Sequence, residues 1–214
     1  MAENLITQAE LESYAPDLDL TQYNATTISG MINRASKRLA KMAGVEGFFT
    51  ASVSAETDRA RINASGELII SFRRRPVAQG GVSAIALKTV DVNQDLTLQS
   101  GGSDIYFIPA GGRYLIYPSN YLISHGTGLI SLRNANLLYE VSYTGGYATD
   151  IADIPSDLKE ATTLMIRDSQ YNPAGLKSFS QGSYSETRSA DGSTPFSTKA
   201  REILEDGDYV RMVV

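Results

Sequence analysis

His125 is the residue with the clearest capacity for catalysis or metal binding, because imidazole can act as a general base or as a metal ligand. It is the only histidine, and the chain has no cysteine. A metal site would therefore lack its usual partner ligands, and nothing in the sequence identifies the partners of a catalytic triad. We interpret Ser124-His125-Gly126-Thr127-Gly128 as a turn between strands.

Two other patterns could in principle support chemistry. Glycine pairs such as Gly80-Gly81 and Gly145-Gly146 bind phosphate only within defined strand–loop–helix motifs, and neither type of motif is present. Asp150, Asp153 and Asp157 could act as acid–base groups or bind a cation, but they better fit a solvated stretch that caps a helix. We expect hairpin turns at the glycine pairs, and no enzyme activity, cofactor or metal site.

Arg73, Arg74 and Arg75 form the one strong charge cluster. They fit a solvated strand end, salt bridges to a neighbouring subunit or partner, or contact with DNA phosphate. Successive strand residues point to opposite faces, so the three side chains would not share one flat surface. A net charge of −5 argues against attraction to nucleic acid. All three interpretations stay open.

The first part of the chain carries helical signals. Thr7-Gln8-Ala9-Glu10 is a capping box, which predicts a short helix that ends before Pro16. A longer helix is predicted from Asn24 or Thr26 to Ala43, because apolar residues recur there every three or four positions. Gly44 follows as a plausible stop.

Between Val45 and Ala148 the pattern changes to a period of two, which indicates strands. The clearest strand is Leu137–Tyr143, in which alternate residues are apolar. Further short strands are expected at Leu68–Phe72, Val82–Val90, Asp104–Ile108, Arg113–Tyr117 and Leu129–Leu132. Together these segments predict a small antiparallel sheet or barrel.

Helix is expected again from Pro155 to Tyr171, and in a short segment at about Thr198–Glu205. The two long helices flank the strands, and each must bury its apolar stripe against a partner. The predicted fold is therefore α+β: a helical bundle interrupted by an inserted antiparallel β module, with a long C-terminal arm. The expected boundaries are 1–46 for the first helices, 47–149 for the β module, and 150–214 for the returning helix, arm and docking segment.

The polar stretch Lys177–Thr194 and the chain end are the expected interaction segments. Phe179 and Tyr184 could anchor the stretch on a neighbour, or the stretch could be a disordered loop. The tail from Tyr209 to Val214 ends in apolar residues, which require burial on the chain's own core or on a partner.

The amino-acid composition limits the classes of protein to which the chain can belong. Apolar residues make up 42% and charged residues 20% of the 214 residues, as in globular proteins. The absence of cysteine excludes disulfides and fits a reducing compartment. We expect no secretion signal and no membrane span.

The order and spacing of several segments resemble the head-to-tail adaptor, or head–tail connector, proteins of long-tailed bacteriophages. The resemblance covers most of the chain. It rests on the helical start Ile6–Leu11 with the amphipathic helix that follows, on Arg74–Val77 before a strand, on Val141–Tyr147 followed by Ile154–Ala161, and on Gly175–Ser178 followed by Gly182–Ser185.

The resemblance implies a structural virion neck protein, assembled in the host bacterial cytoplasm. Such proteins form a ring, usually of twelve copies, beneath the portal protein, extend the DNA channel, and hold a stopper or tail-completion protein. It implies an arm that reaches a neighbour (Lys177, Phe179, Tyr184), passage of double-stranded DNA without specific binding, and portal docking through the C-terminal segment, with these candidate residues: Phe196, Ile203, Leu204, Tyr209, Val210, Met212 and Val213.

A different function also fits the residues. A carbohydrate- or protein-binding module of another phage or surface structure would need an aromatic face. Tryptophan is absent, but Tyr106, Tyr114, Tyr117 and Tyr121 could supply such a face. A hydrolase built around His125 is a third hypothesis, and the least supported.

Overall fold

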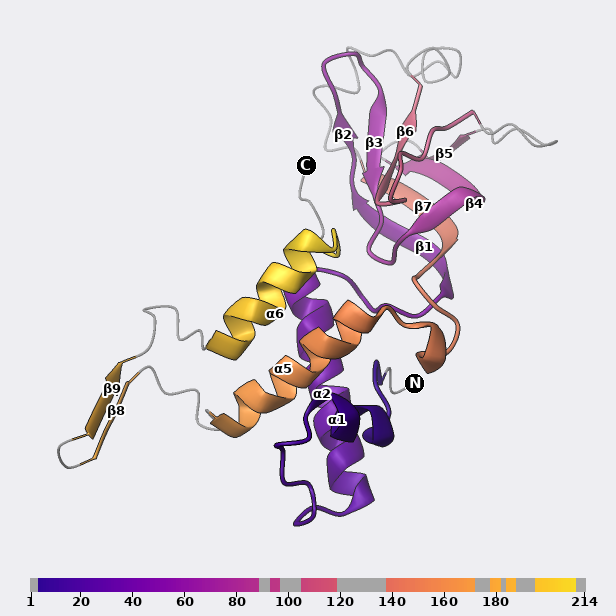
Figure 1. Ribbon diagram of the computed structural model, residues 1–214. Coiled ribbons are helices and arrows are strands. Elements are labelled where there is room, and N and C mark those ends of the chain that lie inside the picture. Colours follow the sequence, from indigo (N-terminus) through magenta and orange to yellow (C-terminus); the bar gives the residue numbers. More distant parts are fainter. Residues whose placement is uncertain are drawn as a thin grey trace. The chain divides into compact units, whose positions relative to one another are not determined.

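The computed structural model describes residues 4–88, 93–96, 105–118, 138–171, 178–181, 184–187 and 195–210 (Figure 1). Within them the chain is mixed α+β, and its sheets are antiparallel. It divides into two compact units. In the described residues, the helical unit contains 4–48 and 150–210, and the β unit contains 49–118 and 138–149 with the gaps given above.

The first helices form where the sequence predicts them. Helix α1, Gln8–Tyr14, starts at a capping box in which the Thr7 hydroxyl and the Glu10 carboxylate each accept from the other's backbone N–H. Helix α2, Ala25–Ala43, has Asn24 as its N-cap, and Gly44 ends it in the left-handed conformation at a φ of 67°.

Helix α5, Ser156–Tyr171, is the centre of the helical unit. It contacts α2 and also α6, Pro195–Asp206. Its residues from Ala161 to Ile166 are all buried, which requires neighbours on more than one side. A single turn of 3-10 helix, η1, Ile151–Asp153, precedes it.

Two buried charged residues of α5 are paired with the first helices. Lys159 Nζ lies 2.6 Å from Glu10 Oε1 on α1, and Asp168 Oδ2 lies 2.7 Å from Arg38 Nη1 on α2. These ion pairs join segments at opposite ends of the chain. Removing one partner would leave the other charge buried and uncompensated.

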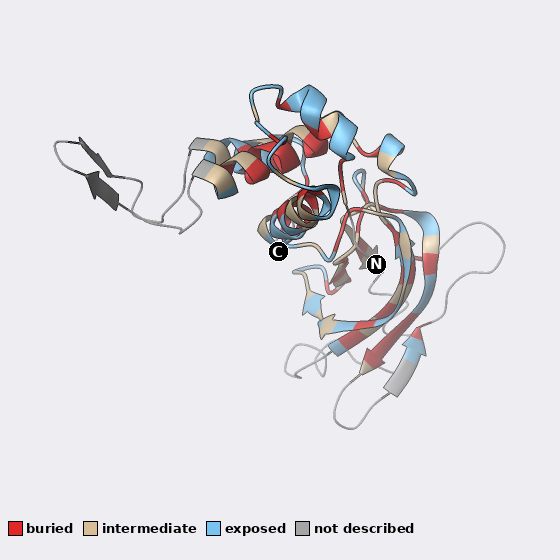
Figure 2. Cartoon of the chain, turned by 90° about the horizontal axis from the view of Figure 1, so that it is seen from below, coloured by how far each residue is buried: buried red, intermediate tan, exposed pale blue. Residues whose placement is uncertain are grey.

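The β unit is built on a four-stranded sheet of order β1-β7-β4-β5 and a three-stranded sheet of order β2-β3-β6. The strands are β1 Ala51–Arg59, β2 Arg61–Ile62, β3 Leu68–Ser71, β4 Val77–Lys88, β5 Asn93–Leu96, β6 Tyr114–Tyr117 and β7 Leu138–Gly145. Tyr139, Val141 and Tyr143 of β7 are buried and alternate with more exposed residues. This confirms the predicted alternation. Figure 2 shows how buried and exposed residues are distributed along the strands and helices.

The core of the β unit is made from its own side chains. Its buried cluster includes Leu68, Phe72, Ile85, Leu115 and Tyr139, and each of its members lies between residues 49 and 149. The unit therefore buries a continuous apolar core of its own.

Some strand predictions differ from the structure. Gly80 and Gly81 lie inside β4, where its pairing with β7 is irregular between Val77 and Val82, rather than in a turn. In the predicted strand Asp104–Ile108, the described residues form only one isolated bridge, between Phe107 and Ile116. The predicted strand Leu129–Leu132 lies outside the described residues.

The polar stretch expected to lack regular structure contains two strands. Strands β8, Ser178–Gln181, and β9, Tyr184–Thr187, pair antiparallel. Gly182 and Ser183, which separate the two strands in the sequence, lie outside the described residues.

Candidate functional site

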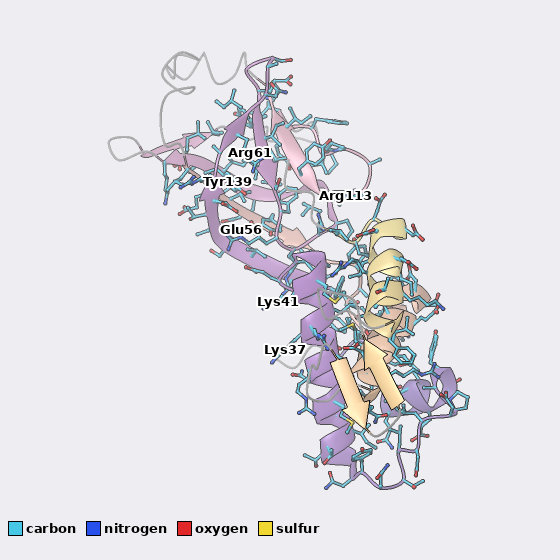
Figure 3. All side chains as sticks on the ribbon, turned by 90° about the vertical axis from the view of Figure 1, so that its left-hand side faces the viewer. Lys37, Lys41, Glu56, Arg61, Arg113 and Tyr139 are labelled. Atoms are coloured by element: carbon cyan, nitrogen blue, oxygen red, sulfur yellow. The ribbon has the colours of Figure 1, made fainter. Side chains whose placement is uncertain are left out.

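Arg73 is held by acidic residues of β1 rather than standing free at a strand end. Its Nη2 lies 3.4 Å from Asp58 Oδ2 and donates to the Thr57 carbonyl at 3.2 Å. Its Nε lies 3.7 Å from Glu56 Oε1. Glu56 is only 6% exposed and is labelled on β1 in Figure 3. These contacts join the β3–β4 connection to β1.

Tyr143 completes this buried polar cluster. Its hydroxyl donates to Glu56 Oε2, and it accepts from the Arg74 backbone N–H at 3.0 Å. Its ring packs on Phe72 with 4.7 Å between centroids. Burial, together with the bond to the Glu56 carboxylate, raises the pKa of Tyr143 above its ordinary value. At neutral pH the hydroxyl is therefore a protonated donor that satisfies a buried carboxylate.

The other two arginines are also occupied within the β unit. Arg74 Nη1 donates to the carbonyl of Phe49. Arg75 is 1% exposed, so its guanidinium lies in the interior. The three residues follow β3 in the connection to β4, where Arg73 and Arg74 are partly exposed and only Arg75 is buried. Arg75, interpreted with its neighbours as a solvated strand end, a contact to another subunit or partner, or a DNA contact, is therefore not on the surface of the β unit.

Gly145 and Gly146 lie where a strand ends and where backbone segments from distant parts of the sequence pass close to one another. A Cβ on Gly145 would lie 2.5 Å from the Arg74 carbonyl oxygen, and one on Gly146 would lie 2.4 Å from the Thr50 Cα. Gly146 also has a φ of 138°, which side chains rarely tolerate. Three segments that are distant in the sequence meet here, and only glycine, which has no Cβ, leaves enough room for their backbones.

The predicted docking residues divide between the interior and the surface of the helical unit. Leu204 is fully buried, and Tyr209 is 6% exposed. The Tyr209 hydroxyl donates to the Asp157 carboxylate at 2.8 Å, and its ring meets the Phe48 ring edge-on at 6.3 Å. Sequence reasoning left open whether the tail docks on its own core or on a partner, and up to Tyr209 it docks on its own core.

The remaining candidates are less constrained. Phe196, Ile203 and Val210 are each partly exposed, while Met212 and Val213 lie outside the described residues. In the arm, Lys177 lies outside them too. Phe179 pairs with Glu186, and Tyr184 with Gln181, across the β8–β9 hairpin.

The tyrosine face required by the carbohydrate-binding hypothesis is not assembled. Tyr106 is 3% exposed, and Tyr117 is fully buried in the β-unit core. Tyr114 is partly exposed, and Tyr121 lies outside the described residues, as does His125. Both buried rings serve packing, which sequence alone does not reveal because tyrosine is common in either setting.

Within the described part of the chain, no group of three or more acidic or histidine side chains is placed to hold a metal ion. None of the helices described there has the length and apolar content needed to cross a membrane.

Comparison with known proteins gives a likeness in fold. No family model matches the chain, and no curated protein matches it in sequence. Among solved structures, a chain from the "Neck of empty GTA particle computed with C6 symmetry" aligns over 99% of this chain and 92% of its own, with a TM-score of 0.50 and 14% identity.

Two further chains come from the virion of a native gene transfer agent (GTA) particle and from a native GTA neck computed with C12 symmetry. They align with TM-scores of 0.47 and 0.41, each at 13% identity, over 98% of this chain and 91% and 94% of theirs. At 14% identity, the likeness to the first of these chains shows a shared fold and no more.

Proposed function

We propose that this chain is a structural, non-enzymatic protein of the neck of a phage-like virion. In this role it forms a ring beneath the portal protein, as one layer between the portal and the tail-side proteins. The ring, of twelve copies by the family resemblance, joins the head to a stopper or tail-completion protein and extends the channel through which double-stranded DNA passes.

The observation that supports this proposal most strongly is the end-to-end likeness to a neck protein. The alignment covers 99% of this chain and 92% of the other, so both units and their order along the chain are included. A fold alone does not determine function. The order of sequence segments that resembles head–tail adaptors supports the same role independently.

The structure changes which residues are suitable for portal docking. Leu204 and Tyr209 are buried within the helical unit, so removing 196–214 would test folding as much as docking. We therefore assign portal docking to the chain end beyond Tyr209, which includes Val210, Met212 and Val213, with the exposed side of Phe196 as a secondary contact.

Co-expression with the portal protein tests the proposal. We expect the full chain to co-purify with portal as rings visible by electron microscopy. A chain lacking 211–214 should keep its thermal unfolding temperature, because Tyr209 and its partners remain, and should lose portal binding. A full chain that neither binds portal nor forms a ring would overturn the neck assignment. A truncated chain that still binds would overturn only the docking assignment.

A further inference from the structure

Helix α2 presents a row of cations without local partners. Arg34, Lys37 and Lys41 are exposed and spaced three and four residues apart, so they share one face. That face is opposite the buried residues Ile32, Ala35 and Leu39. Among the described residues, none of the three cations forms an ion pair, whereas the neighbouring Arg38 is held by Asp168.

The row is continuous with a shallow cleft. Lys37 and Lys41, on successive turns of α2 (Figure 3), border a cleft of about 230 Å³ whose lining includes Leu5, Val45 and Phe48. No acidic residue occurs in α2 itself. The lining also includes Ser36 and Glu46. The face therefore places lysines beside apolar side chains, and its exposed cations are suited to a protein surface of opposite charge.

Helix α6 ends in the opposite charge. Glu202, Glu205 and Asp206 are exposed in its last five residues, which contain no cation. Within the described chain, none of the three is in an ion pair, although Lys199, further back, is held by Glu160 at 3.1 Å. Carboxylates near a helix C-terminus oppose the helix dipole. Such a local conflict with helix stability is expected where a surface serves binding.

The two charged faces belong to different helices of the helical unit, and each lies on the side away from the residues that its helix buries. Helix α5 packs against both α2 and α6, and α2 and α6 also contact each other. The α6 residues that face inward are Ala200 and Leu204, on the side away from Glu202 and Asp206. A closed ring needs two different, complementary patches on opposite sides of each subunit.

We infer that the cationic α2 face of one subunit binds the acidic end of α6 of the next copy of this chain, head to tail. The inference rests on the proposed ring. It commits to a second copy because the same chain carries both complementary faces. DNA would account for the cations of α2 but would give the carboxylates of α6 no role.

Two charge-reversed variants test this contact. The first carries Lys37→Glu with Lys41→Glu, and the second carries Glu202→Lys with Glu205→Lys. All four side chains are exposed, so circular dichroism and thermal unfolding should match the unmodified chain. Each variant alone should lose ring formation in the presence of portal, and its self-association should weaken by about tenfold or more at low salt.

An equimolar mixture of the two variants gives the decisive result. Every contact between unlike variants restores opposite charges, so the mixture should form rings in which the variants alternate. Charge reversal at Arg59 and Arg61, both exposed on the β unit, is the matched control and should leave assembly intact.

Rings formed by either variant alone, or no rescue in the mixture, would overturn the inference and leave the proposed function standing. Loss of DNA binding by the first variant with normal rings from the second would identify the α2 face as a DNA contact instead. An unmodified chain that forms no ring would overturn the proposed function and this contact together.

Discussion

At the residue scale, the Glu56–Tyr143 pair places a carboxylate inside the β unit and supplies it with a hydrogen-bond donor. A carboxylate that is 6% exposed is tolerated because Tyr143 and the Arg73 backbone donate to it and the Arg73 guanidinium lies nearby. Sequence reasoning placed Tyr143 on a strand but did not pair it with Glu56, because the two are separated by 87 positions. The sequence identified the arginine triplet as a cluster, but it did not identify the residues that the arginines contact.

Tyr143→Phe should destabilise the β unit by about 1–3 kcal/mol, because it removes a donor from a buried carboxylate. Tyr139→Phe is a matched control. The Tyr139 hydroxyl donates to the neutral Ser71 carbonyl at 2.9 Å, and its loss should cost about 0.5–1.5 kcal/mol. Denaturant unfolding of both variants measures the difference, and equal losses would contradict a special role for Glu56.

The same pair should make stability depend on alkaline pH. An unfolded tyrosine titrates near pH 10, while the pKa of Tyr143 is raised in the folded chain. Above pH 10 the folded state therefore holds a proton that the unfolded state has lost, so the stabilisation that is complete below pH 10 declines as pH rises. Tyr143→Phe should show a shallower decline between pH 10 and 11 in urea unfolding.

At the element scale, helices and turns with local signals were predictable. The boundaries of α2 follow from Asn24 and Gly44, and the position of β7 from its alternating side chains. Strand β1 gave no such signal. Its residues are mostly small, polar or charged, because β1 is an edge strand with many side chains in solvent. Its one buried residue is Glu56.

The Gly145-Gly146 crossing makes a further prediction at this scale. Gly146→Ala should destabilise the β unit by about 3 kcal/mol or more, because backbone strain and overpacking each cost roughly 1–3 kcal/mol. Gly111→Ala is the control for strain alone. Gly111 has a φ of 94°, but its added Cβ would come no closer than 3.5 Å to the Arg113 side chain. Similar unfolding midpoints for the two variants would contradict the prediction, because they would mean that the backbone near Thr50 shifts to make room for the added Cβ.

At the scale of the whole molecule, the points where the chain enters and leaves the β unit lie side by side. Phe49 and Ala148 form a β-bridge, and the Thr50 N–H donates to the Ala148 carbonyl at 2.7 Å. An inserted unit with adjacent ends can be removed at little entropic cost, because closing the remaining loop depends only weakly on its length.

Two reciprocal fragments test this autonomy. Residues 49–149 alone should fold, because the buried cluster from Leu68 to Tyr143 draws on no other part of the chain. A chain in which a short Gly/Ser linker replaces 49–149 should keep the α2–α5 and α5–α6 packing and the Lys159–Glu10 and Asp168–Arg38 ion pairs. Cooperative thermal unfolding of each fragment is the measurement. A fragment that unfolds without cooperativity would mean that its core depends on the other unit. The helical fragment is the stricter test of independent folding, because its two halves are held together only by tertiary contacts.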